Sequence, residues 1–169
     1  MMNDSMNTPK AEKATSCFDS LLLKNQLCFP LYECSREIVK KYKPFLDELD
    51  LTYTQYITMM VMWERKQLSV KELGECLFLD SGTLTPLLKK LEQKGWVTRK
   101  RASADERVLI VTLTRKGADL KEKARNVPVN VSKCLGCLTA EESASLYRLL
   151  YKLLGCSIPE GGPFLQSAD

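Results

Sequence analysis

Apolar residues recur at helical spacing along most of this chain. From Asp19 to about Lys43 their period is close to 3.6 residues, which predicts an amphipathic helix. The apolar positions of that helix are Leu27, Leu31, Cys34, Ile38 and Tyr42. Pro44 and the break over 49–52 end it, and Thr54 lies near the start of a second predicted helix. The apolar stripe of the second helix is Tyr56, Met59, Met60 and Trp63.

Residues 67–114 show a different pattern, with two short helical runs followed by two β-prone runs. The helical runs cover 68–77 and 83–95, and the break Asp80-Ser81-Gly82 separates them. The β-prone runs at 96–100 and 108–113 are joined by a charged turn. This is the layout of a winged helix-turn-helix, in which one helix enters the major groove and a hairpin lies beside it. Pro86 is expected near the first turn of the second helix, where its missing N–H costs least.

Further helices are predicted after the hairpin. Thr114 has the position of an N-cap for a long helix that Pro128 interrupts. Thr139-Ala140-Glu141-Glu142 has the pattern of a capping box, and a leucine-rich helix then runs to Gly155. The sequence thus predicts a mostly α fold with a small β-hairpin wing.

The outer helices carry more apolar residues than one small winged domain needs. We therefore expect dimerisation through 17–45 and 115–155, within one domain over 17–155 and between polar tails at 1–16 and 156–169. A symmetric dimer suits a palindromic site in double-stranded DNA, where each subunit reads one half.

Positive charge is concentrated on the helix predicted to enter the major groove and on the predicted wing hairpin. The segment 89–107 holds seven basic and three acidic residues, an excess of four that equals the net charge of +4 of the whole chain. Such a local basic footprint favours phosphate binding. The predicted DNA contacts are Ser81, Thr83, Thr85, Lys89 and Lys90 on the helix, and Arg99, Lys100, Asp105 and Arg107 on the wing. In this interpretation Arg107 enters the minor groove and Asp105 braces it.

Composition narrows the class of protein. A hydrophobic fraction of 44% is enough for a packed core. The chain has no apolar run of membrane-spanning length and no secretory signal pattern at its start, so we expect a cytoplasmic protein that does not bind a membrane.

Cysteine is frequent and histidine is absent. The seven cysteines are an odd number, which in an intracellular chain indicates free thiols. The lack of histidine excludes His-based catalytic triads and Cys/His zinc sites. Cys134-Leu135-Gly136-Cys137 has the spacing of half a metal site, but there is no second close pair, so we expect neither a metal nor another cofactor.

These motifs resemble the MarR family of winged-helix regulators over roughly residues 18–155. Asp105-Glu106-Arg107 followed by Leu113-Thr114 is similar to the family's wing motif. Three segments resemble its organic-hydroperoxide-sensing branch. They are 23–29 (Leu-Lys-Asn-Gln-Leu-Cys-Phe), 51–56 (Leu-Thr-Tyr-Thr-Gln-Tyr) and 79–89, which begins Leu-Asp-Ser-Gly-Thr-Leu-Thr-Pro.

The resemblance implies a redox sensor. Cys28 holds the position of a peroxide-reactive thiolate, and Tyr42 and Tyr53 hold those of two phenols that hydrogen-bond to it. A thiolate is the nucleophile towards a peroxide oxygen, and a phenol can stabilise it by donating a hydrogen bond. Cys134 or Cys137 holds the place of a resolving cysteine from the other subunit. Pro30, two residues after Cys28, departs from the pattern, and either kinks a helix there or marks its start.

The leading interpretation is a dimeric repressor, not an enzyme, that leaves DNA when an organic hydroperoxide oxidises Cys28. One alternative is a MarR-type regulator that binds a phenolic or other small ligand between its helices while Cys28 is inert. The other is a thiol-dependent peroxidase, against which stand the basic winged unit and the lack of a thioredoxin-like pattern.

Overall fold

The chain folds into helices and a small sheet. The computed structural model describes residues 18–103, 105–133 and 136–159. They form two compact units, Met1–Glu37 and Ile38–Asp169, whose boundary lies within the first α-helix. The elements are the short 3-10 helices Asp19–Leu21 and Leu23–Asn25, α1 (Cys28–Asp47), α2 (Tyr53–Arg65), β1 (Gln67–Ser69), α3 (Val70–Leu77), α4 (Ser81–Gln93), β2 (Val97–Arg101), β3 (Leu109–Leu113), α5 (Arg115–Ala124), α6 (Val127–Lys133) and α7 (Ala140–Leu153).

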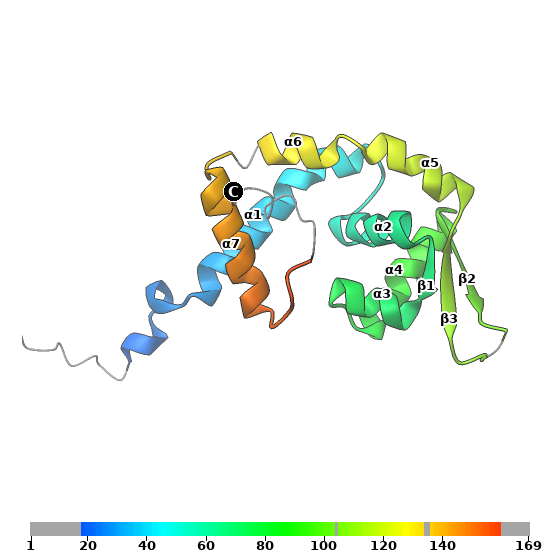
Figure 1. Ribbon diagram of the computed structural model, residues 1–169, viewed down its shortest axis with the longest axis horizontal. Coiled ribbons are helices and arrows are strands. Elements are labelled where there is room, and N and C mark those ends of the chain that lie inside the picture. Colours follow the sequence, from blue (N-terminus) through cyan, green and yellow to red (C-terminus); the bar gives the residue numbers. More distant parts are fainter. Residues whose placement is uncertain (1–17, 104, 134–135, 160–169) are drawn as a thin grey trace, which may run out of the picture. The chain divides into compact units, whose positions relative to one another are not determined.

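The second unit has the winged helix-turn-helix arrangement that the sequence predicts. Helices α2, α3 and α4 gather beside β1, while β2 and β3 form a long hairpin (Figure 1). We call this hairpin, β2 and β3 with the residues that join them, the wing. One prediction needs correction, because the sheet has three antiparallel strands in the order β1-β3-β2. Leu68, placed in a helix from sequence, lies in β1 and pairs with Val111 of β3.

The core of this unit is built from the apolar faces of its helices. Of the stripe predicted for α2, Tyr56 and Met59 are buried, whereas Met60 is 45% exposed, so that position was wrong. Helix α4 buries four leucines on one side, and its polar side chains are exposed except that of Glu92, which is half-buried. Those leucines are Leu84, Leu87, Leu88 and Leu91. They pack in one cluster with Met59 and Met62 of α2, which are fully buried.

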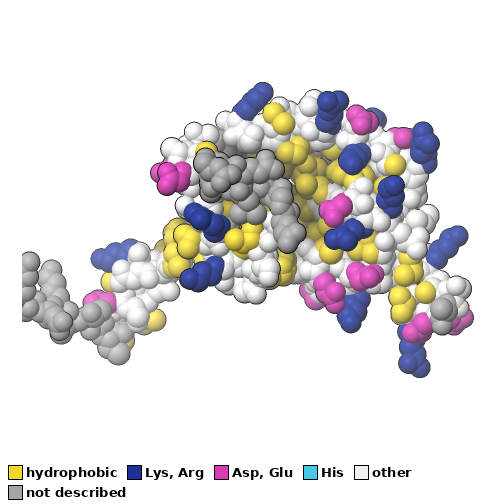
Figure 2. Space-filling model, in the orientation of Figure 1, with side chains coloured by type: hydrophobic (Ala, Val, Ile, Leu, Met, Phe, Trp, Pro, Cys, Tyr) yellow, Lys and Arg dark blue, Asp and Glu magenta, His cyan; other side chains and the backbone are white. Residues whose placement is uncertain are grey.

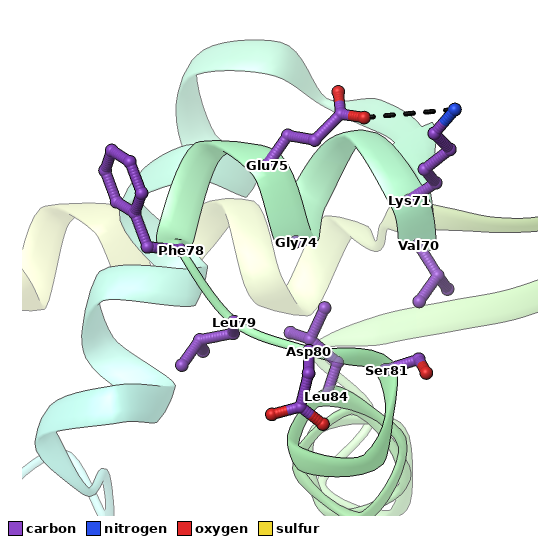
Figure 3. A pocket seen from close by; sticks show the side chains of 9 residues that line it. All are labelled: Val70, Lys71, Gly74, Glu75, Phe78, Leu79, Asp80, Ser81 and Leu84. Atoms are coloured by element: carbon purple, nitrogen blue, oxygen red, sulfur yellow. Dashed lines mark ion pairs between the residues drawn. The ribbon is translucent and has the colours of Figure 1, made fainter. Parts of the chain in front are cut away.

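A glycine allows α3 and α4 to approach closely at the turn between them. A Cβ on Gly74 would lie 2.7 Å from the Leu79 carbonyl oxygen and 3.2 Å from a methyl carbon of Leu84. The turn itself passes through Phe78, whose φ of 55° is in the left-handed region. A cavity of about 530 Å³ opens beside this turn, and Phe78, which is 64% exposed, stands at one end of it (Figure 3).

Several helix boundaries differ from the prediction. The helix predicted from Asp19 begins only at Cys28, after two short 3-10 helices. α1 does not end at Pro44 but continues to Asp47, and the ion pair between Lys43 and Asp47 (2.7 Å) spans the proline. Burial of Leu46 just beyond the proline favours this extension over the lost backbone hydrogen bond. The helix predicted to start at Thr114 is two helices, because α5 ends at Ala124 and Pro128 lies in the first turn of α6.

Local capping was predicted more accurately than helix length. Thr139 and Glu142 form the expected capping box, with bonds of 3.2 and 2.8 Å between each backbone N–H and the other side chain. Thr114 caps α5 by accepting from the N–H of Gly117 at 2.9 Å. Among the described helices, none is long and apolar enough to cross a membrane.

Candidate DNA interface and thiol site

The N-terminal end of α4 presents short hydroxyl side chains. Asp80 caps the helix, accepting from the Thr83 N–H at 3.0 Å and from the Thr83 hydroxyl at 2.8 Å. These hydrogen bonds lower the pKa of the Asp80 carboxyl. The Thr85 hydroxyl donates to the Ser81 carbonyl oxygen at 2.7 Å. Both threonine hydroxyls donate their proton locally, at the start of the helix, so towards a base edge they can act as acceptors.

Every residue predicted to contact DNA from α4 has an exposed side chain, namely Ser81, Thr83, Thr85, Lys89 and Lys90. Ser81, Thr85 and Lys89 are spaced by four residues and therefore share one helix face. The predicted position of Pro86 in the helix needs correction. Because α4 begins at Ser81 and not at Thr83, Pro86 is its sixth residue and lies in the second turn.

The wing carries exposed basic side chains. Figure 2 shows Lys and Arg side chains, in dark blue, beside the wing strands. Lys100 and Arg107 are exposed. The Asp105 carboxylate accepts from the backbone N–H of Arg107 at 2.9 Å, so it fixes the turn that bears this arginine and does not hold its guanidinium.

Arg99 differs from the other predicted contacts. Its guanidinium donates twice to one carboxylate oxygen of Glu92, at 2.7 and 3.0 Å, and its side chain is only 18% exposed. Sequence reasoning placed Arg99 at the DNA and gave Glu92 no role. A basic residue in an alternating strand gives no signal that its partner lies on the preceding helix.

Cys28 is the first residue of α1 and is exposed. Pro30 therefore lies in the first helical turn, where a backbone N–H has no partner within the helix in any case. Of the two possibilities that the sequence left open, the structure agrees more closely with a helix that starts in this region, at Cys28, two residues before Pro30. Cys28 belongs to the first unit, and each unit is described by itself.

The two tyrosines predicted to serve the thiol meet in the second unit. The ring centroids of Tyr42 and Tyr53 are 5.0 Å apart in an edge-to-face arrangement. Burial raises the pKa of both phenols, so their hydroxyls keep the proton that a donor needs. Tyr56, which sequence analysis treated as core packing, adds a third ring 5.9 Å from Tyr42. Its position three residues after Tyr53 on one helix was the available signal.

Burial raises the pKa of Tyr56 to about 12, with smaller effects from Tyr42 and Tyr53. A phenol that stays protonated in the folded protein but ionises near pH 10 when unfolded stabilises the fold below pH 10, and this contribution is lost as the pH rises from about 10 to about 12. We expect Tyr56→Phe to lose less stability than the wild type between pH 9 and about 11.5 in urea unfolding. If the free energy of unfolding of the two proteins changed with pH in parallel, this expectation would be contradicted.

The candidate resolving cysteines are less defined. Cys134 lies outside the described residues. Cys137 is exposed and lies between α6 and α7. Among the described residues, no group of three or more Cys, Asp and Glu side chains is arranged to hold a metal ion.

Comparison with known proteins places this architecture in a family. The family model described as transcriptional regulator SarA/Rot matches residues 40–124. An organic hydroperoxide resistance transcriptional regulator of Bacillus subtilis is 50% identical over 139 residues, covering 80% of this chain and 95% of the relative. The structure of reduced AbfR bound to DNA has a TM-score of 0.68 at 36% identity, covering 81% of this chain and 95% of AbfR.

AbfR, from Staphylococcus epidermidis, has also been solved overoxidised on DNA and in a disulfide form. A mutant of MarR from E. coli with operator DNA has a TM-score of 0.72 at 28% identity, covering 82% of this chain and 98% of MarR. The wing, the exposed hydroxyls of α4 and these likenesses agree. The chain therefore belongs to the MarR family of DNA-binding transcriptional regulators, in the branch that resembles the organic hydroperoxide regulators.

Proposed function

We propose that this regulator is a dimeric repressor that senses organic hydroperoxides through Cys28 and then releases its operator. The observation that carries the proposal is the 5.0 Å pairing of Tyr42 with Tyr53, at the two positions where the resemblance requires phenols. Its support from relatives is the 50% identity to an organic hydroperoxide resistance regulator. The DNA contacts proposed are Ser81, Thr83, Thr85, Lys89 and Lys90 of α4 and Lys100, Asp105 and Arg107 of the wing, with Arg99 treated separately below.

We propose that the thiol and the phenols of one site come from different copies of the chain, with Tyr42 and Tyr53 donating to Cys28 of a second copy. Cys28 and Tyr42 stand fourteen residues apart in the sequence, whereas side chains that meet along one helix are three or four residues apart.

A hollow and a set of exposed apolar side chains suit such a dimer. A cavity of about 310 Å³ adjoins Tyr53 and is lined by Val39, Leu46 and Leu51. The residues flanking the thiol, Leu27 and Phe29, are 68% and 40% exposed. Exposed leucines of α7 and its C-terminal end supply further apolar surface, namely Leu146, Leu149, Leu153 and Leu154. A row of exposed leucines on one helix, such as that of α7, is typical of surfaces where subunits associate.

The proposed chemistry is nucleophilic displacement on the peroxide. The Cys28 thiolate attacks one peroxide oxygen, the O–O bond breaks, and the alkoxide leaves as the alcohol after taking up a proton. The product is a sulfenic acid. A second thiol then attacks the sulfenic sulfur, an S–S bond forms, and the oxygen leaves as water.

Replacing either phenol should slow oxidation without weakening reduced-state DNA binding. A hydrogen bond to a charged group is worth about 1.5 kcal/mol or more, so its loss should reduce the rate of sulfenic acid formation about tenfold. We expect this for Tyr42→Phe and Tyr53→Phe when dimedone trapping is followed over time. Tyr151→Phe, on α7, serves as the control and should react like the wild type. Wild-type rates in the first two variants would mean that these phenols only pack.

Oxidation should also produce a covalent dimer. A disulfide between subunits moves helices, whereas a single added oxygen is a small steric change. We expect hydroperoxide to give a dimer band on non-reducing gels through Cys28 and Cys134, with Cys137 as the second candidate. Cys134→Ser/Cys137→Ser should stay monomeric on the gel, and Cys76→Ser is the control that should cross-link. Cross-linking and DNA release by the double variant as in the wild type would assign resolution to another thiol.

The test of the proposal is DNA binding in two redox states. Reduced wild type first selects a duplex from a random-sequence pool, and its affinity is measured before and after cumene hydroperoxide. We expect wild type and Cys34→Ser, another exposed cysteine of α1, to release the duplex, and Cys28→Ser to retain it. Release of Cys28→Ser by the oxidant would overturn the sensor assignment. Release only by phenolic ligands, or rapid catalytic turnover of peroxide, would favour one of the two alternatives.

A further inference from the structure

The carboxylate of Glu92 makes three hydrogen bonds to Arg99, using both oxygens. One oxygen accepts from the backbone N–H of Arg99 at 2.9 Å, and the other accepts from the guanidinium at 2.7 and 3.0 Å. Glu92 belongs to the last turn of α4 and Arg99 to the middle of β2. The pair therefore joins the helix proposed to read the major groove to the first strand of the wing.

The backbone bond exists because β2 is an edge strand. In the order β1-β3-β2, one side of β2 pairs with β3 and the other side has no neighbouring strand among the described residues. An edge strand leaves outward N–H groups without a ladder partner. Glu92 satisfies one of them, and the same carboxylate holds the arginine side chain, so both the strand and its side chain are fixed to α4.

The ion pair between Glu92 and Arg99 is partly shielded from solvent. The Arg99 and Glu92 side chains are 18% and 35% exposed, less than the partners in the ion pairs Lys94–Asp50 (27% and 81%) and Lys43–Asp47 (72% and 58%). Two hydrogen bonds from one guanidinium to a carboxylate oxygen add directional constraint to charge attraction. The hydrogen bonds from Arg99 also lower the pKa of the Glu92 carboxyl, so the carboxylate stays charged at neutral pH.

We propose that Glu92 and Arg99 are positioning residues for DNA binding: the pair sets the placement of the wing relative to α4, and Arg99 itself does not bind phosphate. This inference rests on the proposed use of α4 and the wing in operator binding. It revises the sequence prediction, which treated Arg99 as a DNA contact.

The two roles of Arg99 predict opposite effects of a change at Glu92. If Arg99 binds phosphate, Glu92→Gln removes a negative charge near DNA and frees the guanidinium, so affinity should rise or stay the same. If the pair positions the wing, Glu92→Gln should weaken binding, although it removes a charge that repels phosphate. Electrostatics alone cannot produce that loss.

The experiment measures affinity of the reduced, full-length protein for the selected duplex as a function of salt. We expect Glu92→Gln and Arg99→Gln each to weaken binding about tenfold or more, the scale of removing one groove interaction per subunit. The double variant should be no worse than either single one, because one constraint is removed in all three. Each should also show a shallower salt slope, by about 0.9 for every phosphate that the wing no longer neutralises.

Two further variants keep the test independent of folding. Arg99→Lys retains the charge but not the fork, so it should weaken binding in the same way, whereas a phosphate contact would tolerate it. Glu106→Gln, on the wing, is the matched control and should not weaken binding. Circular dichroism and thermal midpoints report whether each variant folds.

Wild-type affinity of either Glu92→Gln or Arg99→Lys would overturn the inference. The proposed function would remain intact. A wild-type protein that selects no duplex would overturn both. If selection and oxidative release work in the wild type, only the role of the pair is in question.

Discussion

Raising the salt concentration from about 50 to 150 mM should weaken operator binding by the reduced dimer roughly 200-fold. Each neutralised phosphate contributes about −0.9 to the slope of log affinity against log salt, and several contacts per subunit give a slope of at least about −5. The structure supplies exposed cations for such contacts on both parts of the unit, Lys89 and Lys90 on α4 and Lys100 and Arg107 on the wing.

Fluorescence anisotropy with a labelled duplex checks this over a salt series. The double variant Lys100→Ala/Arg107→Ala should bind more weakly and reduce the magnitude of the slope by about 3.6 if each cation meets one phosphate in each subunit. Lys152→Ala, on α7, is the control and should leave the slope unchanged. A flat response of the wild type would contradict phosphate binding altogether.

Gly117→Ala should lower the free energy of unfolding by roughly 3 kcal/mol or more, because the new methyl group collides with backbone. A Cβ at Gly117 would lie 2.1 Å from the Trp96 carbonyl oxygen and 2.9 Å from a methyl carbon of Leu113. To escape, the start of α5 must move away from the wing. That movement strains the bond from the Thr114 hydroxyl to the Gly95 carbonyl (2.7 Å) and the bond from the Trp63 indole to the Gly117 carbonyl (2.8 Å).

Urea unfolding monitored by circular dichroism measures the decrease. Gly136→Ala is the matched control, since its Cβ would meet nothing closer than the Lys133 carbonyl oxygen at 3.7 Å. It should stay within about 0.5 kcal/mol of the wild type. A similarly small change in Gly117→Ala would show that α5 can shift freely.

Features fixed by local chemistry were predictable from the sequence. The caps at Thr114 and Thr139 need only a threonine hydroxyl that accepts from the backbone N–H three residues later, and both bonds are present. The three-residue strand β1 was missed because it is too short to show a period and forms only through pairing with β3, more than forty residues later. The continuation of α1 past Pro44 depends on burial of Leu46, which belongs to the tertiary fold.

The residues of the candidate site also divide into those that the sequence pointed to and those that only the tertiary structure explains. Residue types and spacing pointed to hydroxyls on α4 that are exposed and to two phenols whose rings meet, while the role of the Cys28 thiol stays a prediction. They were not enough to assign Arg99, because an arginine on a strand has the same pattern whether it faces a phosphate or a carboxylate. The partner of Arg99 lies across a turn, seven residues back, and only the geometry identifies it.

Both tryptophans of the chain lie near the base of the wing, where α5 begins. Trp96 is 7% exposed with the Lys94 ammonium 4.9 Å from its ring centre, and Trp63 donates to the first turn of α5. Indole emission responds to a nearby charge and to the loss of an N–H hydrogen bond. Trp96, between α4 and β2, is thus a built-in optical probe of the joint between the reading helix and the wing, and Trp63 is one of the contact between α2 and α5. Unlabelled protein can therefore report in real time whether either contact changes on oxidation.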